Sequence, residues 1–274
     1  MRVFISADLE GVAGVSRDEQ TDPSQPGYPA ATRLMAAEVN AAVEGALEAG
    51  ADGVVVADGH WSCTNLDPES LHPAAELVSG HPRVRAMAAG LEIGFDAALF
   101  IGYHASSGTP EAILPHTYAD PALGLQVRVN GVAQSEGSLT GMLCGHLGCP
   151  LVMLSGDAAA VDEMRRFVPG IHGVVTKWGL SAQAARSLSP EMVRREIRSA
   201  AARALAGRAK IPPLLPPNEV LLEMEFAHPS SADSCARIPG VNRAGPRTVA
   251  WSGTNYPEAY DLLLALVDLA AAWK

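Results

Sequence analysis

Three apolar segments of this 274-residue chain each end on side chains that commonly bind metals. Asp8 and Glu10 follow the segment 2–7, Asp58 and His60 follow 54–57, and His104 follows 98–101. Short uninterrupted apolar runs are typical of strands that are buried on both faces of a parallel sheet. Ligands of open α/β sheets bind beyond the carboxyl ends of the strands, so these side chains are expected to meet at one rim. The pattern therefore predicts an α/β fold that carries a metal site.

The rest of the chain predicts a mostly parallel sheet with helices on both faces and a smaller C-terminal α/β portion. Helices are expected over 32–49, 158–167 and 190–206, and further strands over 151–154 and 174–177. The proline-rich connector 212–217 divides a catalytic portion, 1–211, from a C-terminal portion, 212–274. The second portion is expected to hold strands over 220–226 and 248–251 and a helix over 256–273, either as a separate unit or packed on the same core.

Two local patterns in the middle of the chain carry more specific predictions. Residues 125–132 alternate apolar and polar side chains, which predicts an edge or antiparallel strand with a turn at Asn130-Gly131. A helix that starts near Ser135 places Gly137, Gly141 and Gly145 on one face. Each glycine inside a helix costs up to ~1 kcal/mol. Three on one face therefore indicate that this backbone packs unusually close to a neighbour, with the sheet as the expected one.

Composition excludes several classes of partner. The net charge is −10 and no basic patch stands out, so neither nucleic acid nor an anionic membrane is an expected partner. The four cysteines form no CxxC motif and no zinc-finger spacing, which indicates isolated thiols in a reducing compartment. The first residues do not resemble a signal peptide, and the longest late apolar stretch is shorter than the ~20 residues of a membrane span. A cytoplasmic location is therefore expected.

The expected metal ligands are carboxylates and imidazoles. Asp8 and Glu10 are two residues apart, so on a strand their side chains would share a face and repel each other unless a cation lay between them. His60 and His104 are weak candidates alone and strong ones together with this pair. Two carboxylates and two imidazoles suit zinc, with Mn²⁺ and Co²⁺ as alternatives.

A hydrolytic site with two metals needs five or more ligands, so a further carboxylate is expected. Glu136, at the start of the glycine-rich helix, is the best candidate, and Asp58 and Asp157 are alternatives. Asp58 can instead orient a ligating histidine. His116, in the loop after His104, is either a general acid or base, an oxyanion stabiliser, or an ordinary surface histidine.

Several motifs resemble the DppA-type D-aminopeptidases, a zinc metallopeptidase family of bacterial dipeptide-transport operons. They are Ser6-Ala7-Asp8-Leu9-Glu10-Gly11-Val12-Ala13-Gly14, Asp58-Gly59-His60, Gly102-Tyr103-His104-Ala105, Glu136-Gly137 and Val175-Thr176-Lys177. The resemblance implies two Zn²⁺ per subunit, held by Asp8, Glu10, His60, His104 and Glu136, with His116 as the catalytic residue. It also implies a homo-oligomer, a decamer of two stacked pentameric rings.

These observations lead to one favoured function and two alternatives. The favoured hypothesis is a di-zinc aminopeptidase that hydrolyses short peptides with a free N-terminus, where metal-activated water attacks the peptide carbonyl. Its D-Ala-D-Ala type of substrate follows from the resemblance alone. The first alternative is a metal-dependent amidohydrolase or phosphoesterase. The second is a metal-binding protein whose ligands close the coordination sphere.

Overall fold

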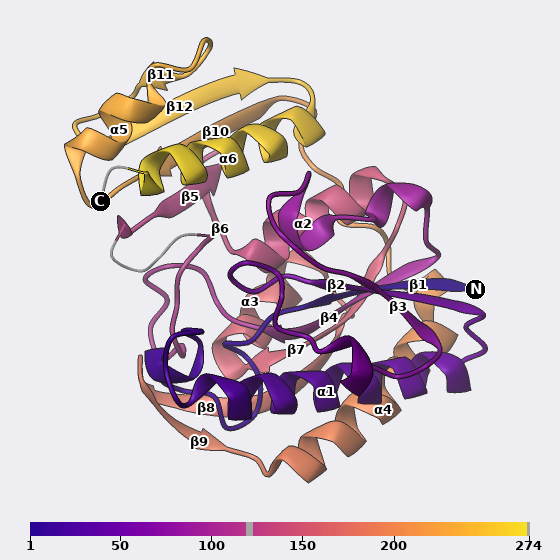
Figure 1. The fold of residues 1–274 in the computed structure, drawn as a ribbon. Coiled ribbons are helices and arrows are strands. Elements are labelled where there is room, and N and C mark those ends of the chain that lie inside the picture. Colours follow the sequence, from indigo (N-terminus) through magenta and orange to yellow (C-terminus); the bar gives the residue numbers. More distant parts are fainter. Residues whose placement is uncertain (119–122, 273–274) are drawn as a thin grey trace.

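The computed structural model describes residues 1–118 and 123–272, and its strands form two sheets (Figure 1). The larger sheet has seven strands in the order β3-β2-β1-β4-β7-β8-β9. Their bounds are β1 (Arg2–Ala7), β2 (Gly53–Asp58), β3 (Ala75–Val78), β4 (Ala97–Tyr103), β7 (Leu151–Asp157), β8 (His172–Ser181) and β9 (Ala184–Ser187). Neighbouring strands are parallel except for the pair β8 and β9. The predicted mostly parallel α/β sheet is therefore confirmed.

Helices cover both faces of this sheet (Figure 1). On one face, α1 (Tyr28–Glu48) lies against α4 (Pro190–Ala206), and their backbones approach so closely that a Cβ on Gly45 would lie 2.3 Å from the Arg198 carbonyl oxygen. On the other face lie α2 (Glu136–His146) and α3 (Ala158–Phe167). The helix expected over 32–49 begins four residues earlier, because Pro29 is tolerated in a first helical turn.

The smaller sheet is antiparallel and is formed mostly by the C-terminal part of the chain. Its order is β11-β12-β10-β5-β6, with bounds β5 (Gln126–Val129), β6 (Val132–Gln134), β10 (Val220–Glu225), β11 (Asn242–Arg243) and β12 (Thr248–Gly253). The helices α5 (Pro229–Cys235) and α6 (Tyr256–Ala271) pack on it, and α6 lies between this sheet and α2 (Figure 1). The expected antiparallel strand and its turn at Asn130-Gly131 are confirmed, because β5 and β6 form a hairpin around this turn. The last expected helical position, residue 273, lies outside the described residues.

The first strand ends earlier than its sequence pattern predicts. β1 stops at Ala7, so Asp8 and Glu10 lie in the turn beyond it, and the prediction that a strand places them on one face is wrong. This turn packs against the end of β4, where Gly102 has a φ of +74°. A Cβ on Gly102 would lie 2.2 Å from the Asp8 carbonyl oxygen. Only glycine therefore allows the end of β4 to reach the residues that follow β1.

The glycine-rich helix α2 approaches a different neighbour most closely. A Cβ on Gly145 would lie 2.0 Å from the carbonyl oxygen of Leu214, in the proline-rich connector. The same test at Gly137 and Gly141 gives nearest atoms at 3.3 Å, from the side chains of Tyr103 and Leu214. The predicted close packing is present, but it is tightest against the connector rather than the sheet.

Two further sequence expectations have structural counterparts. Cys63, Cys144, Cys149 and Cys235 are all buried free thiols. In the described part of the chain, no helix combines the length and the hydropathy that crossing a membrane requires.

Candidate metal centre

Four predicted side chains meet beyond the ends of β1, β2 and β4. His60 Nδ1 lies 3.1 Å from Glu10 Oε2 and 3.5 Å from Asp8 Oδ1. On the other side of the same carboxylate, His104 Nε2 lies 3.4 Å from Asp8 Oδ2. All four side chains are buried. Asp8 therefore presents one oxygen to each histidine, although the two histidines follow different strands.

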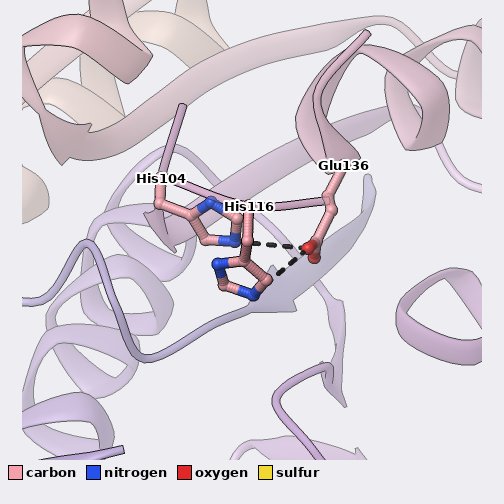
Figure 2. A group of neighbouring side chains, drawn as sticks. All are labelled: His104, His116 and Glu136. Carbon is pink, nitrogen blue, oxygen red and sulfur yellow. Dashed lines mark ion pairs between the residues drawn. The ribbon is translucent and has the colours of Figure 1, made fainter. Parts of the chain in front are cut away.

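Two further predicted residues join this cluster from a loop and a helix (Figure 2). Glu136 is the first residue of α2, and its Oε1 lies 3.3 Å from His104 Nε2 and 3.7 Å from His116 Nε2. The backbone N–H of Tyr118 donates to the same oxygen at 2.7 Å. The structure thus brings all six predicted site residues together.

Each histidine of the cluster forms a hydrogen bond between one ring nitrogen and a main-chain carbonyl oxygen. The partners are Thr21 for His60 Nε2 at 2.8 Å, Ala105 for His104 Nδ1 at 3.0 Å, and Leu114 for His116 Nδ1 at 2.8 Å. A carbonyl oxygen only accepts, so in each ring this nitrogen carries the hydrogen and the other one keeps a lone pair in the neutral form. Metal-binding histidines show this arrangement, because the carbonyl fixes both the tautomer and the ring orientation.

The electrostatics of the cluster favour a bound cation. Burial and the nearby charge of Glu10 raise the pKa of Asp8 to about 7. Burial opposes the ionisation of Glu10, but His60 holds its pKa well below the ordinary value. Burial likewise opposes the charging of His60, and Glu10 and Asp8 still raise its pKa well above the usual range. Without a metal, the site is thus neutralised by protons, on the Asp8 carboxyl and on the His60 ring beside Glu10. A bound divalent cation can supply this positive charge instead.

Three atoms of the cluster are buried and have no hydrogen-bond partner among the residues that the structure describes. They are Asp8 Oδ2, Glu10 Oε2 and His104 Nε2. Leaving buried polar atoms unpaired costs about 1–3 kcal/mol each, and more for charged groups. These atoms also point toward other ligand-type atoms at 3.1–3.4 Å. A coordinated metal would satisfy all of them at once.

The two alternative carboxylates, Asp58 and Asp157, lie outside the cluster and accept hydrogen bonds from backbone N–H groups instead. Asp58 accepts from the backbone N–H groups of Asn65 and Leu66, and Asn65 Nδ2 also donates to the His60 carbonyl at 2.6 Å. Asp58 thereby stabilises the turn that carries His60, as one of the sequence alternatives expected. Asp157 accepts from Ala160 N, at the start of α3, and from Ile113 N.

A cleft of about 390 Å³ opens onto the cluster. Its other walls come from residues that the sequence did not single out: Trp61, Cys63, Pro82, Arg83, Ala86, Tyr118, Leu264, Val267 and Asp268. Leu264, Val267 and Asp268 share one face of α6, which belongs to the smaller sheet's layer. Nothing in the spacing along α6 indicates that this face meets a site near residue 8, because only the packing of the two layers brings them together.

The α/β sheet and its rim of buried carboxylates and imidazoles are those of a metal-dependent hydrolase. Residues 1–265 match the peptidase M55 family, which is described as D-aminopeptidase. A D-aminopeptidase of Bacillus subtilis (strain 168) is 31% identical over 272 residues, which cover 98% of both chains. The chain therefore belongs to the peptidase M55 family of D-aminopeptidases, and the predicted resemblance and enzyme class are confirmed.

A solved structure supports the same assignment. It is described as the zinc-dependent D-aminopeptidase DppA from Bacillus subtilis, a self-compartmentalizing protease. The similarity covers 99% of this chain and 98% of that chain, with a TM-score of 0.95 and 31% sequence identity. The whole fold, including the smaller sheet, is thus shared.

Proposed function

We propose that this protein is a zinc-dependent aminopeptidase that releases an N-terminal D-amino acid from short peptides. The family membership supports the reaction class, and the zinc-dependent relative supports the metal. The observation that carries the proposal is the position of Asp8, whose Oδ1 lies 3.5 Å from His60 Nδ1 while its Oδ2 lies 3.4 Å from His104 Nε2. One carboxylate between two imidazoles is the arrangement expected of a bridging ligand in a two-metal site.

The proposed ligands of two zinc ions per subunit are Asp8, Glu10, His60, His104 and Glu136. Glu10 and His60 would hold one ion, Glu136 and His104 the other, and Asp8 would be shared. Zinc binds nitrogen and carboxylate oxygen at about 2.0–2.2 Å, so tetrahedral ligand atoms lie about 3.3–3.6 Å apart. Three of the four corresponding separations, at 3.3–3.5 Å, fall in this range, and the fourth, between His60 Nδ1 and Glu10 Oε2, is slightly shorter at 3.1 Å. When bound, zinc would supply a Lewis acid and lower the pKa of water at the site.

The proposed proton-transfer residue is His116. Burial and the charge of His104 lower its pKa, so the ring is neutral near pH 7. Its Nδ1–H donates to the Leu114 carbonyl, which leaves Nε2 as the basic nitrogen. His116 also lines the cleft, where a peptide would lie. The ring can therefore accept a proton from the attacking water and return it to the leaving amine.

The cleft favours a peptide over a phosphoester. Arg83 is a basic side chain on its wall, and its guanidinium N–H groups donate to the main-chain carbonyls of Asp58, Val78 and Ala86. Each of its three nitrogens therefore already donates to the protein backbone, which weakens Arg83 as a phosphate ligand. The carboxylate of Asp268, which is not a proposed zinc ligand, also lines this cleft and suits a substrate with a free ammonium group.

The proposed assembly is a decamer of two stacked pentameric rings. The related structure is described as a self-compartmentalizing protease, which supports a closed oligomer. Large apolar side chains of this chain are exposed at Trp61, Val84, Leu180 and Leu215, by 63%, 72%, 73% and 70%. Light scattering coupled to size-exclusion chromatography tests the proposal, because ten chains of 28.5 kDa give 285 kDa. A mass near that of the single chain would overturn it.

The activity is tested by comparing hydrolysis of D-Ala-D-Ala and L-Ala-L-Ala. Purified protein is assayed as isolated, after treatment with a chelator, and after zinc is restored. We expect cleavage of the D-peptide that disappears with chelator and returns with zinc. Cleavage of the L-peptide alone would overturn the proposed stereochemistry. Zinc-independent cleavage, or no cleavage of either peptide by the zinc-loaded protein, would overturn the proposed function.

A further inference from the structure

Lys177 is a buried lysine that the proposed reaction does not use. It lies on β8 and has no exposed surface, whereas lysine is almost never fully buried without partners. Its ammonium group points across the sheet toward the turn that follows β1. That turn carries Asp8 and Glu10, so a residue of β8 reaches the part of the chain that supplies two proposed zinc ligands.

All hydrogen-bond donors of the Lys177 ammonium are satisfied by backbone carbonyls of this turn. Lys177 Nζ donates to the carbonyl oxygens of Glu10, Val12 and Val15, with the Val12 bond at 2.8 Å. An ammonium has three N–H donors, so each one has an acceptor in the same six-residue stretch. Bonds from a charged donor are about twice as strong as neutral ones. Lys177 therefore fixes the path of the backbone from Glu10 to Val15.

The turn lies beyond the end of β1, and its two anchors are on different strands. β4 holds it through the N–H groups of Asp8 and Gly11, which donate to the carbonyls of Ile101 and Gly102 at 2.8 and 2.7 Å, whereas the Glu10 carbonyl is bound by Lys177 of β8. With its carbonyl bound in this way, Glu10 has its carboxylate 3.1 Å from His60 Nδ1. The adjacent Thr176 hydroxyl donates to the Gly11 carbonyl at 2.6 Å. Two adjacent residues of β8, Thr176 and Lys177, thus bind the consecutive carbonyls of Gly11 and Glu10.

The position of the charge adds to this effect. Asp8 and Glu10 are close like charges, and their repulsion disfavours the compact turn. The ammonium of Lys177 donates to the main-chain oxygens of Glu10, Val12 and Val15 rather than to these carboxylates. It can therefore offset the repulsion without occupying the metal position.

We propose that Lys177 is a positioning residue of the zinc centre, which places the Glu10 carboxylate by binding the main chain of the Glu10–Val15 turn. The inference rests on the proposed two-zinc function. Replacement of residues that orient metal ligands costs about 10–100-fold in metal affinity. We expect the loss of Lys177 to weaken zinc binding by that factor.

The test is the zinc affinity of Lys177→Met, measured by competition with a chromogenic chelator. Methionine keeps the length and apolar stem of lysine and removes all three donors. The matched control is Met224→Ala, a core change in β10 that is expected to destabilise the fold without touching the Glu10–Val15 turn. We expect a 10–100-fold weaker affinity for Lys177→Met and an affinity within about 3-fold of wild type for Met224→Ala. Equal losses in both variants, or none in Lys177→Met, would overturn the inference.

A second pair of variants covers the case in which Lys177→Met does not fold. Lys177→Arg keeps the charge and the donors, whereas Lys177→Gln loses the charge. We expect Lys177→Arg to bind zinc more tightly than Lys177→Gln, and the reverse order would contradict the proposal. The visible spectrum of the Co²⁺-substituted protein provides a readout of ligand geometry, and we expect it to change in Lys177→Gln and not in Met224→Ala. Wild-type protein that binds no zinc would instead refute the proposed function itself.

Discussion

The imidazole rings of His104 and His116 stack face to face, with their centroids 4.0 Å apart and their planes inclined by 10°. Each ring is also held by a carbonyl, of Ala105 and Leu114 respectively. The stack and the two hydrogen bonds together fix the direction of both Nε2 atoms, which face the same Glu136 oxygen. A proposed ligand and a proposed proton-transfer group are thus oriented by one packing arrangement.

Replacing His116 separates these two roles. We expect His116→Ala to lower kcat on D-Ala-D-Ala by about 10²–10⁴-fold, the usual contribution of a general acid or base. Zinc content, measured by atomic absorption, should stay at the wild-type value, because the proposed ligands are intact. His146→Ala, at the end of α2, is the matched control and should leave kcat unchanged. Loss of one zinc per subunit in His116→Ala would show instead that His116 is a ligand.

Asp157 links the folding of α3 to the position of His116. Its carboxylate accepts from Ala160 N at 2.7 Å and from Ile113 N at 2.6 Å, and Ile113 lies three residues before His116. We expect Asp157→Ala to lower the free energy of unfolding by about 1–3 kcal/mol, because a helix cap and a buried acceptor are lost together. We also expect kcat to fall with zinc content unchanged.

A matched control for Asp157 exists at the start of α4. The Ser189 side chain accepts from Met192 N at 3.3 Å, and it is not among the described residues that line the cleft. Ser189→Ala should therefore lower stability by about 1 kcal/mol and leave kcat unchanged. Denaturant titration and steady-state kinetics measure both variants. An unchanged kcat in Asp157→Ala would contradict the link to His116.

Glu38 gives the chain a pH-dependent stability. Burial raises its pKa from 4.5 to about 7, against the hydrogen bond from Ala13 N and the charge of Lys177. The folded state therefore favours the protonated form, so this contribution is present below pH 4.5 and is lost as the pH rises through about 7. With about 1.4 kcal/mol per pKa unit, the loss is at most about 3 kcal/mol.

The variant that tests this is Glu38→Gln, which resembles the protonated side chain at every pH. We expect it to be more stable than wild type at pH 8 and similar to wild type at pH 4.5, as measured by urea unfolding of both proteins in the same buffers. The exposed Glu69→Gln is the control, and surface changes of this kind stay within about 0.5 kcal/mol. A stability difference that does not grow with pH would contradict the assignment.

A cluster of three hydroxyl groups connects α6 to the site loop and α2. Tyr260 Oη lies 2.7 Å from Tyr118 Oη and 3.1 Å from Thr140 Oγ1, and the last two lie 2.9 Å apart. We expect Tyr260→Phe and Thr140→Val each to cost about 0.5–1.5 kcal/mol of unfolding free energy. Because the groups share partners, the double variant should cost less than the sum. Additive losses in chemical denaturation would show that the three hydroxyls act independently.

Local pattern predicted the elements that are marked by an uninterrupted apolar run or by a helix-capping pair. The apolar runs at 54–57 and 151–154 became β2 and β7, and Ser189-Pro190 became the start of α4, because burial and capping are decided within a few residues. The short elements β3, β9, β11 and α5 were not predicted. Their sequences are too brief to carry a period, and the three strands form by pairing with the longer strands β2, β8 and β12.

The sequence by itself determined which residues can form the metal centre, because a strand end is marked by the point where an apolar run stops. Asp8, His60 and His104 follow such ends, and the parallel order of the strands places those ends at one rim. Only the tertiary structure decided how these groups face one another. Asp8 and Glu10 lie in a turn, not on a strand, and the Glu10 carbonyl is bound by Lys177, 167 residues further along the chain. Hydrogen bonds between segments so far apart follow from the packing of whole layers, and no local period encodes them.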